Sequence, residues 1–385
     1  MNQNDPKARP KVMLPLGPAS GGEGCGCSCG SDMAPQQSAD RERRFVIGDL
    51  ASPAGPLPRV SSSLTWVDHW GTIKARWGVG RMDYAIDPGL YALGRPGPES
   101  PVLVTANYKM SFDALRSALP GRDTWILVLD TQGINVWCAA GKGTFGTEEV
   151  VHRIAASRLK EVVTHRSLIL PQLGAPGVAA HLVKQQSGFT VHYGPIAAGD
   201  LPAYLDGGGQ ATPAMRRKDF PLRERAVLIP VELVAALKPA ALIAPLLFLS
   251  GGLGGPGGFW QDALREGTWA VFAFLSAVLA GTVLFPLLLP FLPGRAFTTK
   301  GLGLGILIAL AYGFLTAFVG VAWLGMLAWF LMIPALTAYL AMNFTGCSTY
   351  TSPSGVNKEM RWALRLEIGL ALGGCVLWIA ARLVT

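Results

Sequence analysis

The fold is decided by residues 101–130, PVLVTANYKMSFDALRSALPGRDTWILVLD. This stretch begins with the branched apolar run Pro101–Thr105 and ends with a second one, Trp125–Asp130, and turn-forming residues bound both runs. Short apolar runs bounded in this way are typical of strands that are buried on both faces. Residues Ser111–Leu119 lie between the runs and are expected to form a helix. A strand, a helix and a second strand in succession predict a parallel α/β sheet.

The same alternation continues toward the C-terminus. Ser167–Pro171 (SLILP) and Phe189–His192 (FTVH) are two more predicted strands, and Thr147–Arg158 and Pro176–Gln186 are predicted helices. We therefore expect a parallel-sheet, Rossmann-like α/β domain over residues 61–210.

The composition changes near Arg225. The chain of 385 residues has 15% charged residues, against about 25% in typical soluble domains, which argues against a purely soluble protein. A helix needs about 20 apolar residues to cross a bilayer. Five apolar runs beyond this point are long enough to be predicted spans: 227–250, 268–292, 301–320, 321–343 and 364–384. We expect an all-α transmembrane domain of about five helices over residues 227–385.

The first of these runs is interrupted by Glu232 and Lys238. It is therefore predicted either as an interfacial turn followed by a short span, or as one span whose charged side chains extend to the interface.

Lysine and arginine gather in the predicted basic linker 211–226, in 295–300 and in 358–365, which all fall on one side of the membrane. Such an excess marks the cytoplasmic side. We predict a multi-pass protein of the cytoplasmic (inner) membrane, in contact with lipid, whose N-terminal domain lies in the cytoplasm. The first residues contain no apolar segment of the kind that a secretory signal peptide requires.

Residues 1–60 are rich in Gly, Ser, Pro and Ala without an apolar period, and we expect a flexible tail. Within it, Cys25, Cys27 and Cys29 alternate with small residues. Three such thiols could bind a soft metal ion, although their spacing is not that of a structural zinc site, and the alternative is a set of incidental cysteines. The net charge of +8 is spread thinly and no nucleic-acid motif is present, so we predict no nucleic-acid partner.

Residues 131–146, TQGINVWCAAGKGTFG, carry the chemistry. They follow a predicted strand, as do residues 105–109 and 172–177, and ligands of parallel sheets bind at that edge. Asn135 is a suitable N-cap for a short helix that would place Cys138 in its first turn, where the helix dipole favours a thiolate. Lys142 would add a positive charge at i+4. Three glycines allow close approach of a large ligand: Gly141, Gly143 and Gly146.

Two other interpretations compete with a functional thiol. A phosphate-binding loop is disfavoured, because Val136 stands where the motif needs its first glycine and Gly143 follows Lys142. A buried structural cysteine stays open, because free cysteine packs like a small apolar residue. A catalytic nucleophile would also need a base, and nothing in the spacing directs His152 or His165 at Cys138.

The segment Asn135-Val-Trp-Cys-Ala-Ala-Gly-Lys142 matches the cap-helix motif N-[VI]-W-C-A-[AS]-G-K in full. On these residues the chain resembles the HgcA family, the membrane-bound corrinoid protein of microbial mercury methylation. The resemblance extends from about Trp66 to the C-terminus and includes residues 104–113, 174–178 and 343–352. Related corrinoid iron–sulfur proteins share the domain type but lack the cysteine cap helix and the membrane spans. No family role transfers to the cysteine-rich tail.

The resemblance implies a corrinoid-binding α/β domain that holds cobalamin base-off, with the catalytic Cys138 thiolate as the lower axial ligand of cobalt. Thr105 and Asn107 would hydrogen-bond the amide arms of the corrin, unless they only cap turns, and Trp137 would pack on the corrin or on the core. The residues implied in cofactor binding are Asn135, Val136, Trp137, Cys138, Ala139, Ala140, Gly141, Lys142, Thr105 and Asn107.

The resemblance also implies an activity: a methyl group on Co(III) passes to Hg(II) as a formal carbanion and forms methylmercury. The methyl group would come from a methyl-folate through a corrinoid methyltransferase, and a ferredoxin-like protein with two [4Fe–4S] clusters would return cobalt to Co(I). Two alternatives stay open, because the cap helix does not specify the acceptor. They are a membrane-anchored corrinoid methyl carrier that serves another acceptor, and a five-span transporter with a cytosolic regulatory domain.

Overall fold

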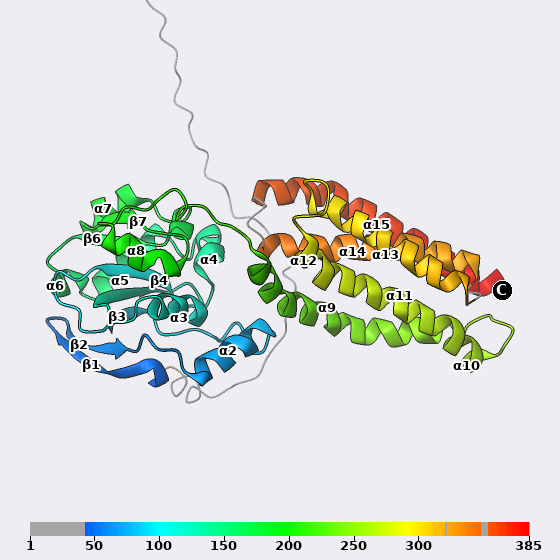
Figure 1. Ribbon diagram of the computed structural model, residues 1–385, viewed down its shortest axis with the longest axis horizontal. Coiled ribbons are helices and arrows are strands. Elements are labelled where there is room, and N and C mark those ends of the chain that lie inside the picture. The colour runs from blue at the N-terminus through cyan, green and yellow to red at the C-terminus, as the bar shows by residue number, and fades with distance from the viewer. Residues whose placement is uncertain (1–42, 320–321, 348–352, 385) are drawn as a thin grey trace, which may run out of the picture. The chain divides into compact units, whose positions relative to one another are not determined.

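The computed structural model describes residues 43–319, 322–347 and 353–384 (Figure 1). An α/β domain comes first along the chain and a helical region follows it. The predicted cysteine site at Cys25, Cys27 and Cys29 lies outside the described residues.

The α/β domain is built on a seven-stranded, mostly parallel sheet with the strand order β1-β2-β3-β5-β4-β6-β7. The pairs formed by β5, β4, β6 and β7 are all parallel, whereas β3 pairs antiparallel with β5 and β1 antiparallel with β2. The predicted α/β class is therefore confirmed. The strands are β1 Val46–Ser52, β2 Gly55–Val60, β3 Gly89–Leu93, β4 Val102–Ala106, β5 Thr124–Leu129, β6 Ser167–Leu170 and β7 Thr190–Tyr193.

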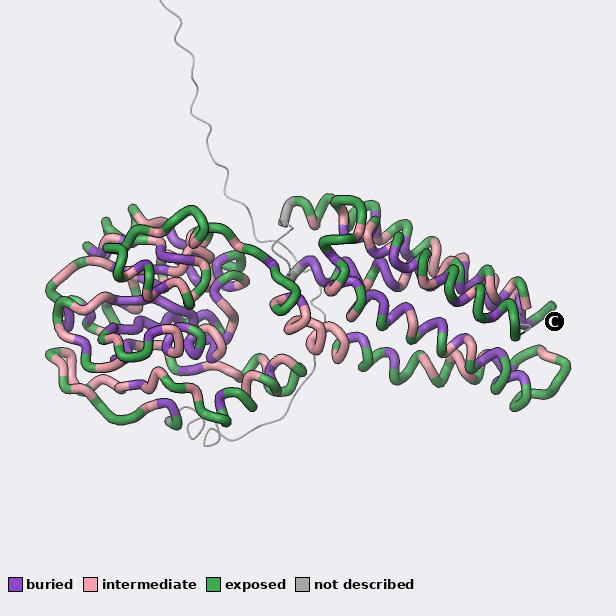
Figure 2. Tube along the Cα trace, in the orientation of Figure 1, coloured by how far each residue is buried: buried purple, intermediate pink, exposed green. Residues whose placement is uncertain are grey.

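Helices cover both faces of the sheet. Because successive side chains of a strand point to opposite faces, one strand contributes to a core on each side. Val102 and Val104 of β4 join a core with the helices α4, α5 and α7, whereas Leu103 joins a second core with α3 and α8. Every residue of β4 and β5 is buried, which explains their unbroken apolar sequence (Figure 2). The helices are α2 Trp66–Arg76, α3 Lys109–Ser117, α4 Val136–Lys142, α5 Thr147–Ala156, α6 Leu159–Val162, α7 Ala180–Ser187 and α8 Leu201–Asp206, with the 3₁₀ turns η1 Arg43–Phe45, η2 Gln172–Gly174 and η3 Ala198–Asp200.

The expected tail over residues 1–60 is wrong for its last part, because 46–60 form β1 and β2 of the sheet. Their residues are mostly exposed or half-buried, so the sequence shows no apolar period. Pro56 and Pro58 lie within β2 and also argue against a strand when the sequence is taken alone. The strand β3 and the helix α2 were not predicted either.

The helical region contains, within the residues that the structure describes, five helices long and apolar enough to cross a membrane, as predicted. The first, α9, is a single helix of 29 residues despite Pro230, Pro239 and Pro245, so it is not an interfacial turn followed by a short span. These candidate spans are α9 Leu222–Ser250, the composite helix Phe259–Leu288, α13 Phe297–Ala317, α14 Trp323–Asn343 and residues Gly355–Val384 of α15. The composite helix consists of α10 Phe259–Asp262, the π-helical turn η4 Ala263–Gly267, α11 Thr268–Leu279, the π-helical turn η5 Ala280–Leu284 and α12 Phe285–Leu288. The 3₁₀ turn η6 Phe344–Cys347 follows α14, and α15 runs over Pro353–Val384.

Small residues bring α13 and α14 together. A Cβ on Gly301 would lie 2.7 Å from the Cα of Ala338, and one on Gly305 would lie 2.5 Å from the Cα of Pro334. Close approach at small residues is the usual way in which membrane helices pack.

Candidate functional site

The loop between β5 and α4 is held by Asn107, which follows the end of β4 directly. Its Oδ1 accepts hydrogen bonds from the backbone N–H groups of Thr131 (3.1 Å) and Gly133 (3.0 Å), and Thr131 Oγ1 lies 2.8 Å from the same oxygen. Its Nδ2 donates to Asp130 Oδ1 at 3.2 Å. Gln132 and Gly133 both have positive φ, at 57° and 68°, so the turn is tight. Asn107 therefore positions the start of α4.

Asn135 caps α4 as predicted. Its Oδ1 accepts a hydrogen bond of 2.9 Å from the backbone N–H of Cys138, which is the third residue of the helix. The helix ends at Gly143, whose φ of 86° is favourable for glycine. Cys138 consequently lies in the first turn of a capped helix.

The inner side of α4 packs against the segment that follows β6. A Cβ on Gly177 would lie 2.2 Å from the carbonyl oxygen of Phe145 and 3.0 Å from the Cα of Ala140. A Cβ on Gly174 would lie 2.5 Å from the Phe145 ring. Only glycine allows this approach, so Gly174 and Gly177 fix the position of α4.

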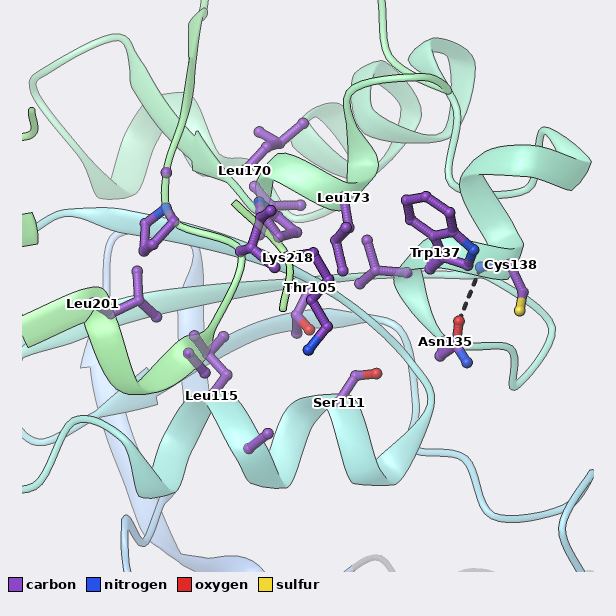
Figure 3. A pocket seen from close by; sticks show the side chains of 18 of the residues that line it. Thr105, Ser111, Leu115, Asn135, Trp137, Cys138, Leu170, Leu173, Leu201 and Lys218 are labelled. Atoms are coloured by element: carbon purple, nitrogen blue, oxygen red, sulfur yellow. Dashed lines mark hydrogen bonds between the residues drawn. The ribbon is translucent and has the colours of Figure 1, made fainter. Parts of the chain in front are cut away.

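A cavity of about 480 Å³ opens at the carboxyl ends of β4 and β6, the edge at which the sequence predicts a ligand (Figure 3). Most of its lining side chains are apolar, and Thr105 and Ser111 contribute hydroxyl groups. Its size is typical of a small-molecule or cofactor site. The residues labelled in Figure 3 are Thr105, Ser111, Leu115, Asn135, Trp137, Cys138, Leu170, Leu173, Leu201 and Lys218.

Trp137 and Cys138 occupy the wall of the cavity that α4 forms. In Figure 3, the Trp137 ring lies toward the other labelled residues and the Cys138 sulfur lies at the outer edge. Trp137 is 43% exposed and thus does not pack in the core. Cys138 is half-buried and free, so the interpretation as a buried structural cysteine is not supported.

Half of the ten predicted cofactor-binding residues line the cavity, and half do not. Thr105, Asn135, Val136, Trp137 and Cys138 line it. The other five have different positions. Asn107 uses its amide to hold the loop, Ala139 and Ala140 are buried against the core, and Gly141 and Lys142 are exposed.

Two polar groups that the sequence did not single out lie in segments beside the cavity, although neither residue lines it. The hydroxyl of Tyr108 and Oε1 of Gln172 are buried without a hydrogen-bond partner. Burial raises the pKa of Tyr108; the positive charges of Arg81 and Arg76 lower it, and Cys138 raises it further. Tyr108 and Gln172 fall in the predicted edge segments 105–109 and 172–177, but only the three-dimensional structure shows that these atoms lack partners.

Neither histidine considered as a base lines the cavity. His152 lies on α5, 3.5 Å from the carboxylate of Glu149. His165 precedes β6 and its Nε2 lies 2.9 Å from the carbonyl oxygen of Ser100. Within the described residues, no group of three or more His, Cys, Asp or Glu side chains could hold a metal ion by itself.

Comparisons with known proteins point to one group of relatives. The family model of the CO dehydrogenase/acetyl-CoA synthase delta subunit matches residues 80–205, which include the whole of α4. The chain is 32% identical over 128 residues to the acetyl-CoA decarbonylase/synthase complex subunit gamma of Archaeoglobus fulgidus, which covers 33% of this chain and 27% of the relative. It is 32% identical over 131 residues to the gamma subunit of Methanopyrus kandleri (34% and 28%) and 34% identical over 133 residues to gamma subunit 2 of Methanosarcina thermophila (33% and 27%). The chain thus spans little more than a quarter of the length of these relatives. The residues matched by the family model fall within the α/β domain.

Proposed function

We propose that the α/β domain binds a corrinoid at the cavity and that the chain transfers a methyl group to Hg(II), with the Cys138 thiolate as the lower axial ligand of cobalt. One observation carries the proposal: a free, half-exposed thiol stands in the first turn of a capped helix at the edge of an apolar cavity. Further support comes from the match of residues 80–205 to a corrinoid-binding methyl-carrier family and from the full cap-helix motif.

The residues present fit a corrinoid. The apolar walls suit the faces of a macrocycle, and Thr105 and Ser111 can hydrogen-bond polar arms at its rim. The Tyr108 hydroxyl and Gln172 Oε1 are buried without partners in the neighbouring segments but do not line the cavity, so the fit rests on the lining residues. Thiolate is a soft ligand of the kind that suits electron-rich transition metals.

The chain's own residues position the thiol. The Asn135 cap orders the first turn of α4 and so fixes the place of Cys138 at the cavity. Asn107 and Gly177 fix the loop and the helix from behind, as outer-shell groups orient a metal ligand. When bound, the corrinoid supplies a cobalt centre that carries the methyl group and releases it to Hg(II) as a methyl-anion equivalent, which gives CH₃Hg⁺. The Cys138 thiolate would be a strong donor to such a metal and would favour this release, because ligand identity is a main control that a protein has over a bound metal.

The remaining parts of the proposal concern place and partners. The five apolar helices would anchor the chain in the cytoplasmic membrane, with the α/β domain in the cytoplasm. A methyl-folate corrinoid methyltransferase would supply the methyl group. A ferredoxin-like protein with two [4Fe–4S] clusters would restore the reduced cobalt.

A second candidate function is a membrane-anchored corrinoid methyl carrier that serves a different acceptor. The names of the relatives favour it, because they are subunits of an acetyl-CoA decarbonylase/synthase complex. Both candidate functions would use the same cavity beside α4 and differ only in the acceptor of the methyl group.

The test uses the full chain loaded with methylcobalamin without oxygen and given Hg(II) as a thiolate complex. We expect methylmercury from the wild type, none from Cys138→Ala, and normal amounts from the matched control Cys375→Ala, which alters an exposed cysteine on α15. Full activity of Cys138→Ala would refute the role of the thiolate. Methylation of other thiophilic acceptors without methylmercury would favour the second candidate.

A further inference from the structure

Helix α2 has an apolar stripe that nothing in the α/β domain covers. Trp66, Trp70, Ile73 and Trp77, which caps the helix, follow one another at intervals of four, three and four residues and therefore lie along one side. Their exposed fractions are 74%, 49%, 40% and 47%. A run of three exposed tryptophans is uncommon on a water-facing surface, and such patches mark contact with another molecule or a membrane.

The opposite side of α2 is fixed to the domain. Asp68 accepts a hydrogen bond of 2.7 Å from Lys109 Nζ and lies 3.0 Å from the guanidinium of Arg116. Asp113 contacts the same two cations, at 2.6 Å and 2.7 Å. The cluster of these four buried residues balances two carboxylates with two cations.

Further contacts fix the rotation of α2. Arg116 donates to the carbonyl oxygens of Ser61 and Ser63, at 2.7 Å and 2.9 Å, and so ties down the segment that leads into the helix. A Cβ on Gly71 would lie 2.6 Å from the Tyr84 hydroxyl, which leaves no room for the helix to shift inward. Since α2 cannot rotate without breaking these contacts, its tryptophans stay outside.

The free charge beside the stripe is positive and suits an anionic surface. Lys74 flanks the stripe with its Nζ 5.7 Å from the centre of the Trp70 ring, whereas Arg76 on the other flank is half-buried. Asp68, the acidic residue of the helix, is neutralised on the inner side. Val79 and Met82, just beyond the helix, extend the exposed apolar surface.

We propose that α2 is an interfacial helix whose Trp66–Trp77 stripe inserts into the headgroup layer of the bilayer that holds the chain's own spans. Tryptophan is enriched at that depth, and an apolar face with Trp beside a basic side chain such as Lys74 is typical of helices that lie in the membrane plane. The fifteen residues 207–221 between α8 and α9 reach at most about 50 Å, so the domain stays close to the lipid surface. The proposal assumes that the helical region is inserted, but it does not depend on corrinoid or mercury.

The test places the photo-crosslinker p-benzoylphenylalanine at position 66, 70 or 77 of the full chain, one position at a time, in vesicles of phosphatidylethanolamine and phosphatidylglycerol. Leu182 of α7 is the matched control, an exposed apolar residue (36%) on a different helix. Because each position is exposed and already holds a large apolar side chain, the fold should tolerate the replacement. Mass spectrometry of the irradiated protein identifies what each position contacts.

We expect phospholipid adducts at all three tryptophan positions and none at Leu182. An adduct with a second copy of the chain, with another protein or with the chain's own spans would overturn the proposal, as would the absence of any adduct. Lipid adducts at Leu182 in equal yield would also overturn it, since the contact would then not be specific to α2. Loss of methyl-transfer activity with unchanged lipid adducts would bear on the proposed function alone.

Discussion

Helices α2 and α4 begin in the same way, but their third residues have opposite environments. Thr65 caps α2 and accepts a hydrogen bond from the backbone N–H of Asp68, and Asn135 caps α4 and accepts one from Cys138. The Asp68 carboxylate is buried between Lys109 and Arg116. The Cys138 sulfur, among the described residues, has no hydrogen bond or disulfide and lies at a cavity.

This difference shows how one local motif serves two purposes. In α2 the side chain favoured by the helix N-terminus is satisfied inside the protein, so it anchors the helix and leaves the other side free for an external surface. In α4 the backbone is satisfied by Asn135 and the loop by Asn107, so the third side chain stays available to a ligand. The following predictions test this contrast.

The largest effect is expected for Asp68→Asn. Removing one partner of a buried ion cluster leaves uncompensated charge and costs roughly 3–5 kcal/mol of folding free energy. Thermal unfolding of the detergent-solubilised full chain should show a clear drop in Tm. The control Asp206→Asn removes an exposed partner of Arg122 and should leave Tm unchanged. Equal effects of the two variants would mean that the cluster does not anchor α2.

A smaller effect is expected for Gly177→Ala, which forces a methyl group against Phe145 and Ala140. Overpacking of this kind costs about 1–3 kcal/mol, and it should displace α4 and weaken corrinoid binding. Gly141→Ala is the matched control, because its Cβ meets open space within α4 and should stabilise the helix by about 0.5–1 kcal/mol. Hydrogen exchange over residues 136–142 measures the stability of α4 in each variant. A stability change of the same sign in Gly177→Ala and Gly141→Ala would contradict the described packing.

Loss of the caps should give effects of about 1 kcal/mol that differ between the two helices. Asn135→Ala should speed hydrogen exchange in the first turn of α4, because it removes the acceptor of the Cys138 N–H. Thr65→Ala should affect α2 less, because Asp68 keeps its contacts with Lys109 and Arg116. A larger effect in α2 would show that the cap, and not the ion cluster, fixes that helix.

The smallest effect is expected when the pH is changed near neutrality, where the stability that Asp68 contributes should stay constant. Burial alone would raise the pKa of Asp68, but hydrogen bonds from Lys109 and the Thr65 backbone hold it well below its usual range. A lowered pKa in the folded state adds stability above the unfolded value of about 3.9, and this stability is lost as the pH falls below it. The difference in Tm between wild type and Asp68→Asn should be constant from about pH 7 to 5 and shrink only below about pH 4. Shrinkage near pH 6 would contradict the assignment.

Periodicity was enough to predict the centre of the fold. The strands β4 and β5 are continuous apolar runs because both of their faces are covered, whereas β6 and β7 are shorter and alternate between buried and more exposed residues. The five long helices are apolar over enough residues to cross a membrane. The strands β1 and β2 escaped prediction because they are partly exposed, and Pro56 and Pro58 argue against a strand. The helix α2 escaped because its apolar stripe faces outward and a carboxylate occupies its inner side.

The candidate site was predictable in part. The cap and the position of Cys138 follow from local sequence, because an N-cap acts within one turn. The role of Asn107 does not follow, because its partners at Asp130, Thr131 and Gly133 lie 23 to 26 residues away. The unpartnered atoms of Tyr108 and Gln172 are likewise a property of the folded chain.

The most direct test of the account is cobalt X-ray absorption of the full chain loaded with cobalamin. We predict one sulfur ligand on cobalt in the wild type and in Cys375→Ala, and its replacement by a lighter atom in Cys138→Ala. Cobalt bound only through nitrogen or oxygen in the wild type, or a sulfur ligand that persists in Cys138→Ala, would contradict the account.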